Sequence, residues 1–433
     1  MIRQPEARPA RELSADLYRV VAVVVVVIGH WLVSAVTYRD GRFGNDYPLE
    51  ALPWTQWLTL VFQVVPVFFL VGGYASAASW TRWRAAEGRR WPDWVRQRLA
   101  AILGPTTAYV ALVLATIGAL SLVGVAGSRL SFGGWAVAMH LWFIPVYLIV
   151  LSLTPLAVAA HRRWGLLVPV VLALAVAAVD ITARNSDVPT VGLANYVLCW
   201  GMLYQLGICW HAGLLRGRGA ALLAAAAAVA VAILLGMRWY PISMVGAPGA
   251  TAQNNFPPNV ALLAFGTAQA ALLVAVAPAV TRRLRRACWM PALAAANAKV
   301  MAVYLWQMVP VVIVALVGYP AGLLPQPETG TAAWFWFRLT WLVILAVVLA
   351  AELTLLWLAR SVFDRPLPLI DIGLPWWTAP ALLTAGLAGA VVVLVRFSVD
   401  GFAPAGHFPT AFAVLYMAAI ALLSVGAARR EAG

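Results

Sequence analysis

The sequence predicts an all-α integral membrane protein: a polytopic bundle of about twelve transmembrane helices with both termini in the cytoplasm. Composition, recurring apolar runs and the placement of arginine predict it. Of the 433 residues, 63% are hydrophobic and only 11% are charged, and the mean hydropathy is +0.86. A soluble domain is about half apolar and about one quarter charged, so lipid is the main solvent of this chain.

Twelve apolar runs are long enough, or nearly so, to cross a bilayer, which needs about twenty helical residues. They leave no room for a sizeable soluble domain. We expect the spans at residues 17–37, 56–78, 99–120, 135–158, 165–181, 194–211, 219–236, 259–279, 293–317, 333–358, 376–396 and 409–427.

Arginine placement supports this count and sets the orientation. With the N-terminus in the cytoplasm, every cytoplasmic segment carries at least two arginines, and no external segment carries more than two. This is the pattern that the positive-inside rule requires, and a missed span would reverse it in every later segment. We therefore assign the net charge of +14 to loops facing anionic lipid of the plasma membrane, and expect no nucleic-acid partner.

The first span has a competing interpretation as a cleaved signal peptide, because residues 33–35 (Val-Ser-Ala) resemble a small-residue cleavage site. The apolar stretch over residues 17–36 is long for a signal core, however, and it contains His30. We predict that this span stays in the protein.

Ionisable residues inside a span cost about 2.5–3.5 kcal/mol each on insertion scales, so they mark candidate functional positions. The first span carries Asp16, Arg19 and His30. Eleven residues separate Arg19 from His30, which places both on one helix face with an axial rise of about 16 Å. We expect Arg19 at the cytoplasmic interface, where a snorkelling anchor is the alternative. We expect His30 in the outer half, where the alternative is an interhelical hydrogen bond.

His140 and Trp142 form a second cluster near the outer end of the fourth span. His30 is expected at a similar depth, so the two imidazoles can share one polar cavity. Imidazole is the side chain best suited to proton transfer near neutral pH. The alternative is that His140 is an interfacial residue of the aromatic belt.

Other polar residues are weaker candidates. Gln307 lies on the ninth span, and Asn254 and Asn255 lie in an external loop. We expect Asp180 and Arg338, near the outer ends of their helices, to be solvated.

Motifs for metal and serine chemistry are missing from the sequence. It contains no Walker A loop, no H-E-x-x-H, no Cys/His metal spacing and no G-x-S-x-G elbow. The three cysteines, Cys199, Cys209 and Cys288, show no metal or redox spacing and are predicted to be packing residues. We expect no metal site.

Four motifs, in order along the chain, resemble those of the membrane-bound acyltransferase 3 family. They are Asp16-x-x-Arg19 with His30, Pro66-Val67-Phe68-Phe69-Leu70-Val71-Gly72-Gly73-Tyr74, His140-Leu141-Trp142-Phe143 and Tyr304-Leu305-Trp306-Gln307. The resemblance covers residues 15–360 as a transmembrane domain and leaves residues 361–433 as two additional C-terminal helices. Gly72 stands where the family usually has serine and Gln307 where histidine is common, so the resemblance gives Gln307 no role in proton transfer.

The resemblance implies an acyltransferase that uses acyl-CoA, with acetyl-CoA as the default donor and no metal. The donor would bind at the cytoplasmic side, where Arg19 and Asp16 are the candidate residues for the coenzyme. Arginine is always charged and suits a coenzyme phosphate.

The implied acceptor is a hydroxyl of a glycan, a glycosylated metabolite or a lipid. His30 would act as the general base. His140 and Trp142 would orient the acceptor or stabilise the oxyanion. The candidate residues for acceptor binding are Trp142, Asn254, Asn255 and Gln307.

Two other functions stay open at this point. Twelve spans with internal termini are also a common plan for a transporter or flippase of a lipid-linked or small-molecule substrate, although repeated halves are not evident. A non-catalytic membrane partner that keeps the fold is the other possibility, and Gln307 favours it mildly.

Overall fold

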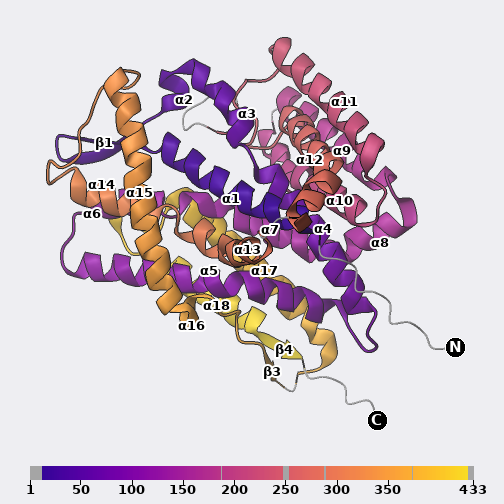
Figure 1. Cartoon of the computed structure of the whole chain (residues 1–433). Helices are drawn as coiled ribbons and strands as arrows, with labels where there is room; N and C mark the ends of the chain where they lie inside the picture. The colour runs from indigo at the N-terminus through magenta and orange to yellow at the C-terminus, as the bar shows by residue number, and fades with distance from the viewer. Residues whose placement is uncertain (1–11, 187, 247–252, 287–288, 373, 428–433) are drawn as a thin grey trace.

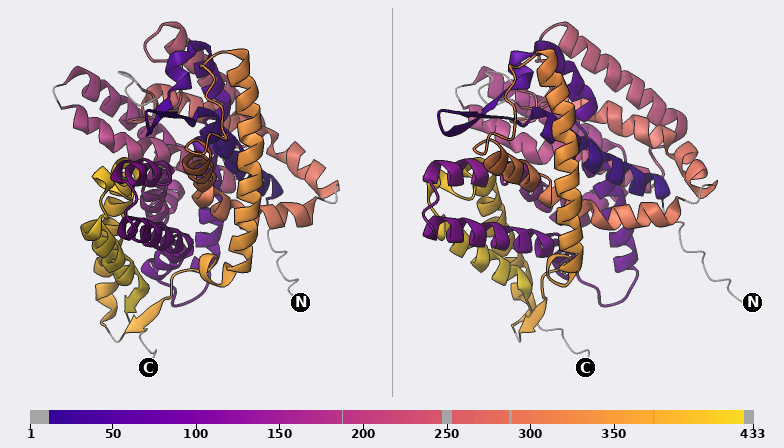
Figure 2. Two further views of the ribbon diagram at one scale, coloured as in Figure 1. Left: turned by 90° about the vertical axis from the view of Figure 1, so that its left-hand side faces the viewer. Right: turned by 60° about the vertical axis from the view of Figure 1, so that its left-hand side comes forward.

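A computed structural model describes residues 12–186, 188–246, 253–286, 289–372 and 374–427. Within these ranges the chain is a bundle of α-helices with only four short strands, which confirms the all-α membrane bundle (Figures 1 and 2). Cys288 and the terminal residues 1–11 and 428–433, on which the predicted termini depend, lie outside the described residues.

The helices and strands have the following bounds. The helices are α1 (Leu13–Val33), α2 (Pro48–Ala51), α3 (Thr59–Phe62), α4 (Val65–Arg84), α5 (Trp91–Leu122), α6 (Gly127–Ala136), α7 (Phe143–Ser152), α8 (Thr154–Trp164), α9 (Leu167–Asn185), α10 (Asn195–His211), α11 (Gly217–Gly236), α12 (Val260–Arg286), α13 (Met290–Trp306), α14 (Val309–Gly318), α15 (Ala332–Leu358), α16 (Arg360–Phe363), α17 (Ala379–Asp400) and α18 (Thr410–Ser424). The short 3-10 helices are η1 (Pro53–Leu58), η2 (Met139–Trp142), η3 (Pro189–Ala194), η4 (Trp376–Thr378) and η5 (Pro404–Gly406). The strands are antiparallel β1 (Ala35–Arg39) and β2 (Arg42–Asp46), and parallel β3 (Ile370–Ile372) and β4 (Val425–Ala427).

Every predicted span overlaps a helix, but two spans are broken. In the described part of the chain, nine helices are long and apolar enough to cross a membrane, and two bent pairs raise the number to as many as eleven. The pairs are Gly127–Ala136 with Met139–Ser152, bent by 42°, and Met290–Trp306 with Val309–Gly318, bent by 45°. The twelfth predicted span contains α18, whose 15 residues are fewer than the roughly twenty of a straight crossing.

The two ends of α1 define two sides of the bundle. The β1–β2 hairpin directly follows α1, and we call that side the hairpin side; Figure 1 shows β1 at the upper left. Arg19 lies in the second turn of α1, and we call the opposite side the Arg19 side. The helix α4 runs from the hairpin side to the Arg19 side, antiparallel to α1, because its first residues follow the hairpin and α2–α3.

Helices α4 and α10 pack backbone against backbone. A Cβ atom added to Gly73 would lie 2.0 Å from the carbonyl oxygen of Tyr204, and one added to Gly207 would lie 2.0 Å from that of Leu70. Lipid gives no hydrophobic drive for helix association, so small residues that allow close packing hold such pairs together. The start of α4 forms a wall of the cavity described below, so this contact also positions that wall.

The last two helices pack on the rest of the bundle. Helix α17 contacts η2 and α7, and the Phe402 N–H donates to the Gly134 carbonyl at 3.1 Å. Helix α17 thus supports the segment that carries His140. The predicted boundary between residues 360 and 361 stays a prediction.

Gly207→Val is expected to destabilise the protein, because the added side chain would overlap the α4 backbone; overpacking costs about 1–3 kcal/mol and more where a backbone must move. The measurement is the thermal unfolding midpoint in detergent, together with monodispersity. Gly201→Val is the matched control, since a Cβ at Gly201 on the same helix meets nothing within 4 Å. Equal midpoints for the two variants would contradict the close contact of α4 with α10.

Candidate active site

A cavity of about 540 Å³ lies on the hairpin side of the bundle. His30, His140, Trp142 and Asn255 all line it, so the two predicted histidines do share one cavity. Most of the other lining side chains are apolar or aromatic, from α1, η1, α3, α6 and α15. The cavity is therefore less polar than the sequence led us to expect.

The two later motifs lie at the two helix breaks. His140 and Trp142 belong to η2, directly after the break that ends α6, and Gln307 caps the C-terminus of α13. Pro310 explains the second break, because proline lacks the N–H that would bond the Trp306 carbonyl and its ring crowds that carbonyl. The broken fourth and ninth spans place these polar side chains inside the bundle.

Side chains donate to five backbone carbonyls around the two breaks. In lipid, each unsatisfied carbonyl would cost several kcal/mol, so irregular backbone at membrane depth needs internal partners. The bonds are Gln307 Nε2 to Tyr304 O (2.9 Å), His140 Nε2 to Leu305 O (3.1 Å), Trp31 Nε1 to Gln307 O (2.7 Å), Tyr304 OH to His140 O (2.5 Å) and Tyr109 OH to Val137 O (2.6 Å). Two of these hydrogen bonds, between His140 and Leu305 and between Tyr304 and His140, join one break to the other and so stabilise both.

This network fixes the tautomer of His30. The Tyr304 carbonyl can only accept, so the amide nitrogen of Gln307 must face it, and the amide oxygen Oε1 faces His30 Nδ1 at 3.0 Å. Since Oε1 is also only an acceptor, Nδ1 carries the proton and donates it. The lone pair of the neutral imidazole is then on Nε2, which has no hydrogen-bond partner among the described residues. His30 lines the cavity, and Nε2 is the ring nitrogen whose lone pair is unused.

His140 is placed differently. It is 1% exposed, and its Nε2–H is used by the Leu305 carbonyl. Its Nδ1 is buried, without a hydrogen-bond partner in the part of the chain that the structure describes. The geometry therefore favours His30 over His140 as the base, and the catalytic role of His140 stays a prediction.

Gln307 is fully buried, and its side chain bonds His30 and the Tyr304 carbonyl. It does not line the cavity. The predicted contact of Gln307 with the acceptor stays untested, and its hydrogen bonds make it a residue that orients His30. Trp142 is half-buried on the cavity wall, with its ring 6.2 Å from that of Trp200.

An aromatic floor closes the cavity toward the Arg19 side. Phe68, Phe143 and Tyr304 line the cavity there, and the Phe143 ring lies 5.6 Å from each of the other two. Phe143 also stacks on Tyr147, one helical turn further toward the Arg19 side, at 5.3 Å. A Cβ at Gly72 would lie 2.8 Å from the Tyr147 hydroxyl oxygen. The tyrosine hydroxyl thus fills the space of the serine that the family usually has at position 72.

Arg19 and Asp16 lie below this floor, outside the cavity. Asn297 on α13 joins them: Arg19 Nη1 donates to Asn297 Oδ1, and Asn297 Nδ2 donates to Asp16 Oδ1, both at 3.3 Å. Arg19 and Arg98 both act electrostatically on Tyr147. Arg19 lies about 16 Å from His30 along α1, and Arg98 of α5 is a second arginine that acts on Tyr147. Sequence reasoning did not single out Asn297 or Arg98.

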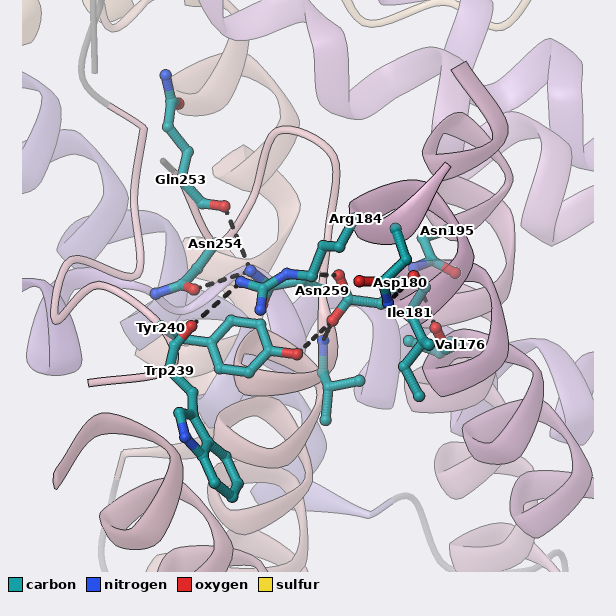
Figure 3. A network of polar contacts seen from close by, with 12 residues as sticks. Val176, Asp180, Ile181, Arg184, Asn195, Trp239, Tyr240, Gln253, Asn254 and Asn259 are labelled. Atoms are coloured by element: carbon teal, nitrogen blue, oxygen red, sulfur yellow. Dashed lines mark hydrogen bonds and ion pairs between the residues drawn. The ribbon is translucent and has the colours of Figure 1, made fainter. Parts of the chain in front are cut away.

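The two loop asparagines have different surroundings. Asn254 is fully buried; its Nδ2 donates to the carbonyls of Pro241 (2.6 Å) and Ser243 (2.8 Å), and its Oδ1 accepts from Asn259 (2.9 Å). Figure 3 shows the Asn254–Asn259 contact beside Arg184 and Tyr240. These bonds hold the loop together, whereas Asn255 lines the cavity. Substrate binding by either asparagine stays a prediction.

Asp180 and Arg338 are buried, so the expectation of solvated positions is wrong for both. Asp180 accepts from the Tyr240 hydroxyl at 2.5 Å and pairs with Arg184 at 3.5 Å, as Figure 3 shows. Burial raises the pKa of the Tyr240 hydroxyl, and the hydrogen bond to Asp180 raises it further. The loop after α11 covers Asp180, which the sequence did not reveal.

The described residues contain no group of three or more His, Cys, Asp or Glu side chains that could hold a metal ion. Cys199 and Cys209 are buried free thiols.

A family model described as an acyltransferase domain, that of the acyltransferase 3 family, matches residues 12–356. No curated protein and no solved structure gives a significant match. The matched range runs from α1 into α15, so it contains the cavity-lining His30, both helix breaks and the Arg19 cluster. The chain therefore belongs to the acyltransferase 3 family, and it is a multi-pass membrane protein of that family.

Proposed function

We propose that the protein transfers an acyl group, acetyl by default, from acyl-CoA to a hydroxyl of a glycan, a glycosylated metabolite or a lipid. The observation that supports this proposal most strongly is the fixed tautomer of His30. Its Nδ1–H is held by Gln307, and its Nε2 is left for a substrate in the cavity. This is the arrangement that general-base catalysis requires of an imidazole.

The reaction is a direct acyl transfer. His30 Nε2 takes the proton of the acceptor hydroxyl as its oxygen attacks the thioester carbonyl carbon, and the resulting tetrahedral intermediate expels the coenzyme thiolate. The thiolate then takes the proton from His30, so the base is regenerated. Gln307 holds the imidazole in the required tautomer and orientation, as the third residue of a catalytic triad does. The indole N–H of Trp142 on the cavity wall donates to the oxyanion.

The donor comes from the Arg19 side, which is cytoplasmic under the positive-inside rule, and the hairpin side faces the outside of the plasma membrane. Arg19 and Arg98 hold the coenzyme phosphates. The pantetheine arm of the coenzyme passes Tyr147 and enters the cavity through its floor, at the position that the Phe143 ring occupies in this structure. Both termini lie in the cytoplasm in this orientation.

His30→Ala is expected to lower acyl transfer by about 100-fold or more, because a positioned base contributes on the order of 10²–10⁴ in rate. The measurement is protein-dependent transfer of label from radiolabelled acetyl-CoA into an extract of cell-envelope glycans and lipids, repeated with longer acyl-CoAs. His407→Ala, at an exposed histidine, is the matched control and keeps full activity. Equal transfer by His30→Ala and the wild type would remove His30 from the chemistry. Substrate flux without coenzyme A and without labelled product would point to a transporter.

Arg19→Gln is expected to raise the KM for acetyl-CoA about tenfold or more with little change in kcat, since a charged hydrogen bond to a distant phosphate contributes mainly to binding. Steady-state kinetics with varied acetyl-CoA provide the measurement. Arg163→Gln removes an exposed arginine of α8 and is the control. An unchanged KM in Arg19→Gln would place the coenzyme elsewhere.

A further inference from the structure

Arg338 on α15 carries a positive charge inside the protein, on the wall of the cavity. Its side chain is 5% exposed, and no described carboxylate lies within ion-pairing distance of it. Its Nη1 donates to the Ser34 carbonyl at 2.9 Å. Its Nε is buried and has no hydrogen-bond partner in the part of the chain that the structure describes. A guanidinium has five N–H donors, so most of its hydrogen-bonding capacity is unused.

Three aromatic rings surround the guanidinium. Its central carbon lies 5.4 Å from the Trp334 ring, 5.6 Å from the Phe337 ring and 5.5 Å from the Trp341 ring. Such cation–π contacts stabilise the charge of the guanidinium. The rings offer its N–H groups no oxygen or nitrogen acceptor. Most N–H donors of the planar guanidinium therefore remain available to another partner.

Acidic groups near Arg338 are already paired. Among the described residues, Tyr319 and Asp46 of the hairpin act electrostatically on Arg338, and Asp46 is the carboxylate of the two. Asp46 pairs with Arg39 at 3.6 Å and accepts from the Thr329 hydroxyl at 3.0 Å. A buried cation without a carboxylate partner is costly, and a bound anion would offset that cost.

Arg338 lines two cavities. It lines the large cavity that contains His30, and also a second cavity of about 140 Å³ on the hairpin side. Arg39 and Asp46 line the smaller cavity as well. The guanidinium is thus reachable from both cavities by a small anionic group, despite its burial.

The position of Arg338 relative to His30 is set by α1. Ser34, whose carbonyl accepts from Arg338, is the C-cap of α1, and its N–H and hydroxyl both bond the His30 carbonyl, at 3.0 and 2.7 Å. Four residues of helix correspond to a rise of about 6 Å. Measured along the α1 axis, an anion on Arg338 would therefore lie about one helical turn beyond His30, on the side away from the aromatic floor.

We propose that Arg338 binds a phosphate or carboxylate group of the acceptor, whose hydroxyl then faces His30. The acceptor is thus an anionic hydroxyl compound, with the anion and the reacting hydroxyl about one sugar ring apart. That the bound compound is the acceptor rests on the proposed function, whereas the anion site on Arg338 does not depend on it. The same anionic chemistry is offered by a soluble sugar phosphate or uronate and by a phospholipid headgroup, and the test separates these sources.

The test is equilibrium binding without any acyl donor. Purified protein in phosphatidylcholine nanodiscs is titrated with radiolabelled glucose 1-phosphate, with glucuronate and neutral methyl glucoside as competitors. The wild type binds saturably, glucuronate competes and methyl glucoside does not. Arg338→Gln weakens binding about tenfold or more, the loss expected for a charged hydrogen bond. Arg42→Gln, which removes an exposed charge of the hairpin that lines neither cavity, stays within about twofold of the wild type, because solvent screens such a charge.

Arg338→Lys distinguishes loss of the anion site from unfolding of the protein. Lysine keeps the positive charge but lacks the planar set of guanidinium N–H donors, so this variant is expected to bind with intermediate affinity. If glucose 1-phosphate does not bind, the second arm uses mixed nanodiscs with phosphatidylglycerol. Retention of that lipid through purification by the wild type and Arg42→Gln, but not by Arg338→Gln, supports a lipid headgroup as the source.

Absence of binding to the wild type in both arms would overturn the inference, as would equal affinity in Arg338→Gln. Because no acyl donor is present, anion binding without any acyl transfer would contradict the proposed function alone. Acyl transfer that needs His30 but not Arg338, with no anion binding, would contradict this inference alone.

Discussion

Every backbone carbonyl freed at the two helix breaks must find a donor inside the protein, because lipid offers none. This constraint accounts for the arrangement of the site. His140, Tyr304, Gln307 and Trp31 all donate to break carbonyls. The orientation of Gln307 follows from its bond to the Tyr304 carbonyl, and the tautomer of His30 follows from Gln307. The chemistry proposed here is thus a consequence of how irregular backbone is stabilised within a membrane.

The two departures from the family pattern have physical explanations. At position 72 a side chain would require Tyr147 to move, because the Tyr147 hydroxyl lies 2.8 Å from where a Cβ would be. At position 307 an amide replaces the common histidine, and an amide is well suited to donate to a carbonyl and accept from an imidazole at the same time. Gln307 therefore does not favour a non-catalytic protein.

Much of the fold was predictable from the sequence, since long apolar runs in lipid must be helical. The placement of Arg19 and His30 on one helix followed from periodicity alone. The breaks were not predicted: Pro310 is visible in the sequence, but many proline-containing spans stay continuous. The burial of Arg338 was not predicted, because a position near the end of a helix suggests exposure to solvent. In the structure the end of α1 packs against this part of α15, and Arg338 donates to the Ser34 carbonyl. Asn297, which joins Asp16 to Arg19, is 278 residues from Arg19 in the chain, so no local pattern reveals it.

The proposed chemistry depends most on the protonation of His30, which nitrogen NMR of isotope-labelled histidine side chains measures directly. The His30 signals are assigned by their loss in His30→Ala. We expect a neutral His30 with its proton on Nδ1 and an unprotonated Nε2. We expect that single tautomer to be lost in Gln307→Leu but not in Gln205→Leu, at a buried glutamine of α10. A proton on Nε2 in the wild type, or a mixture of tautomers unaffected by Gln307→Leu, would contradict the proposed chemistry.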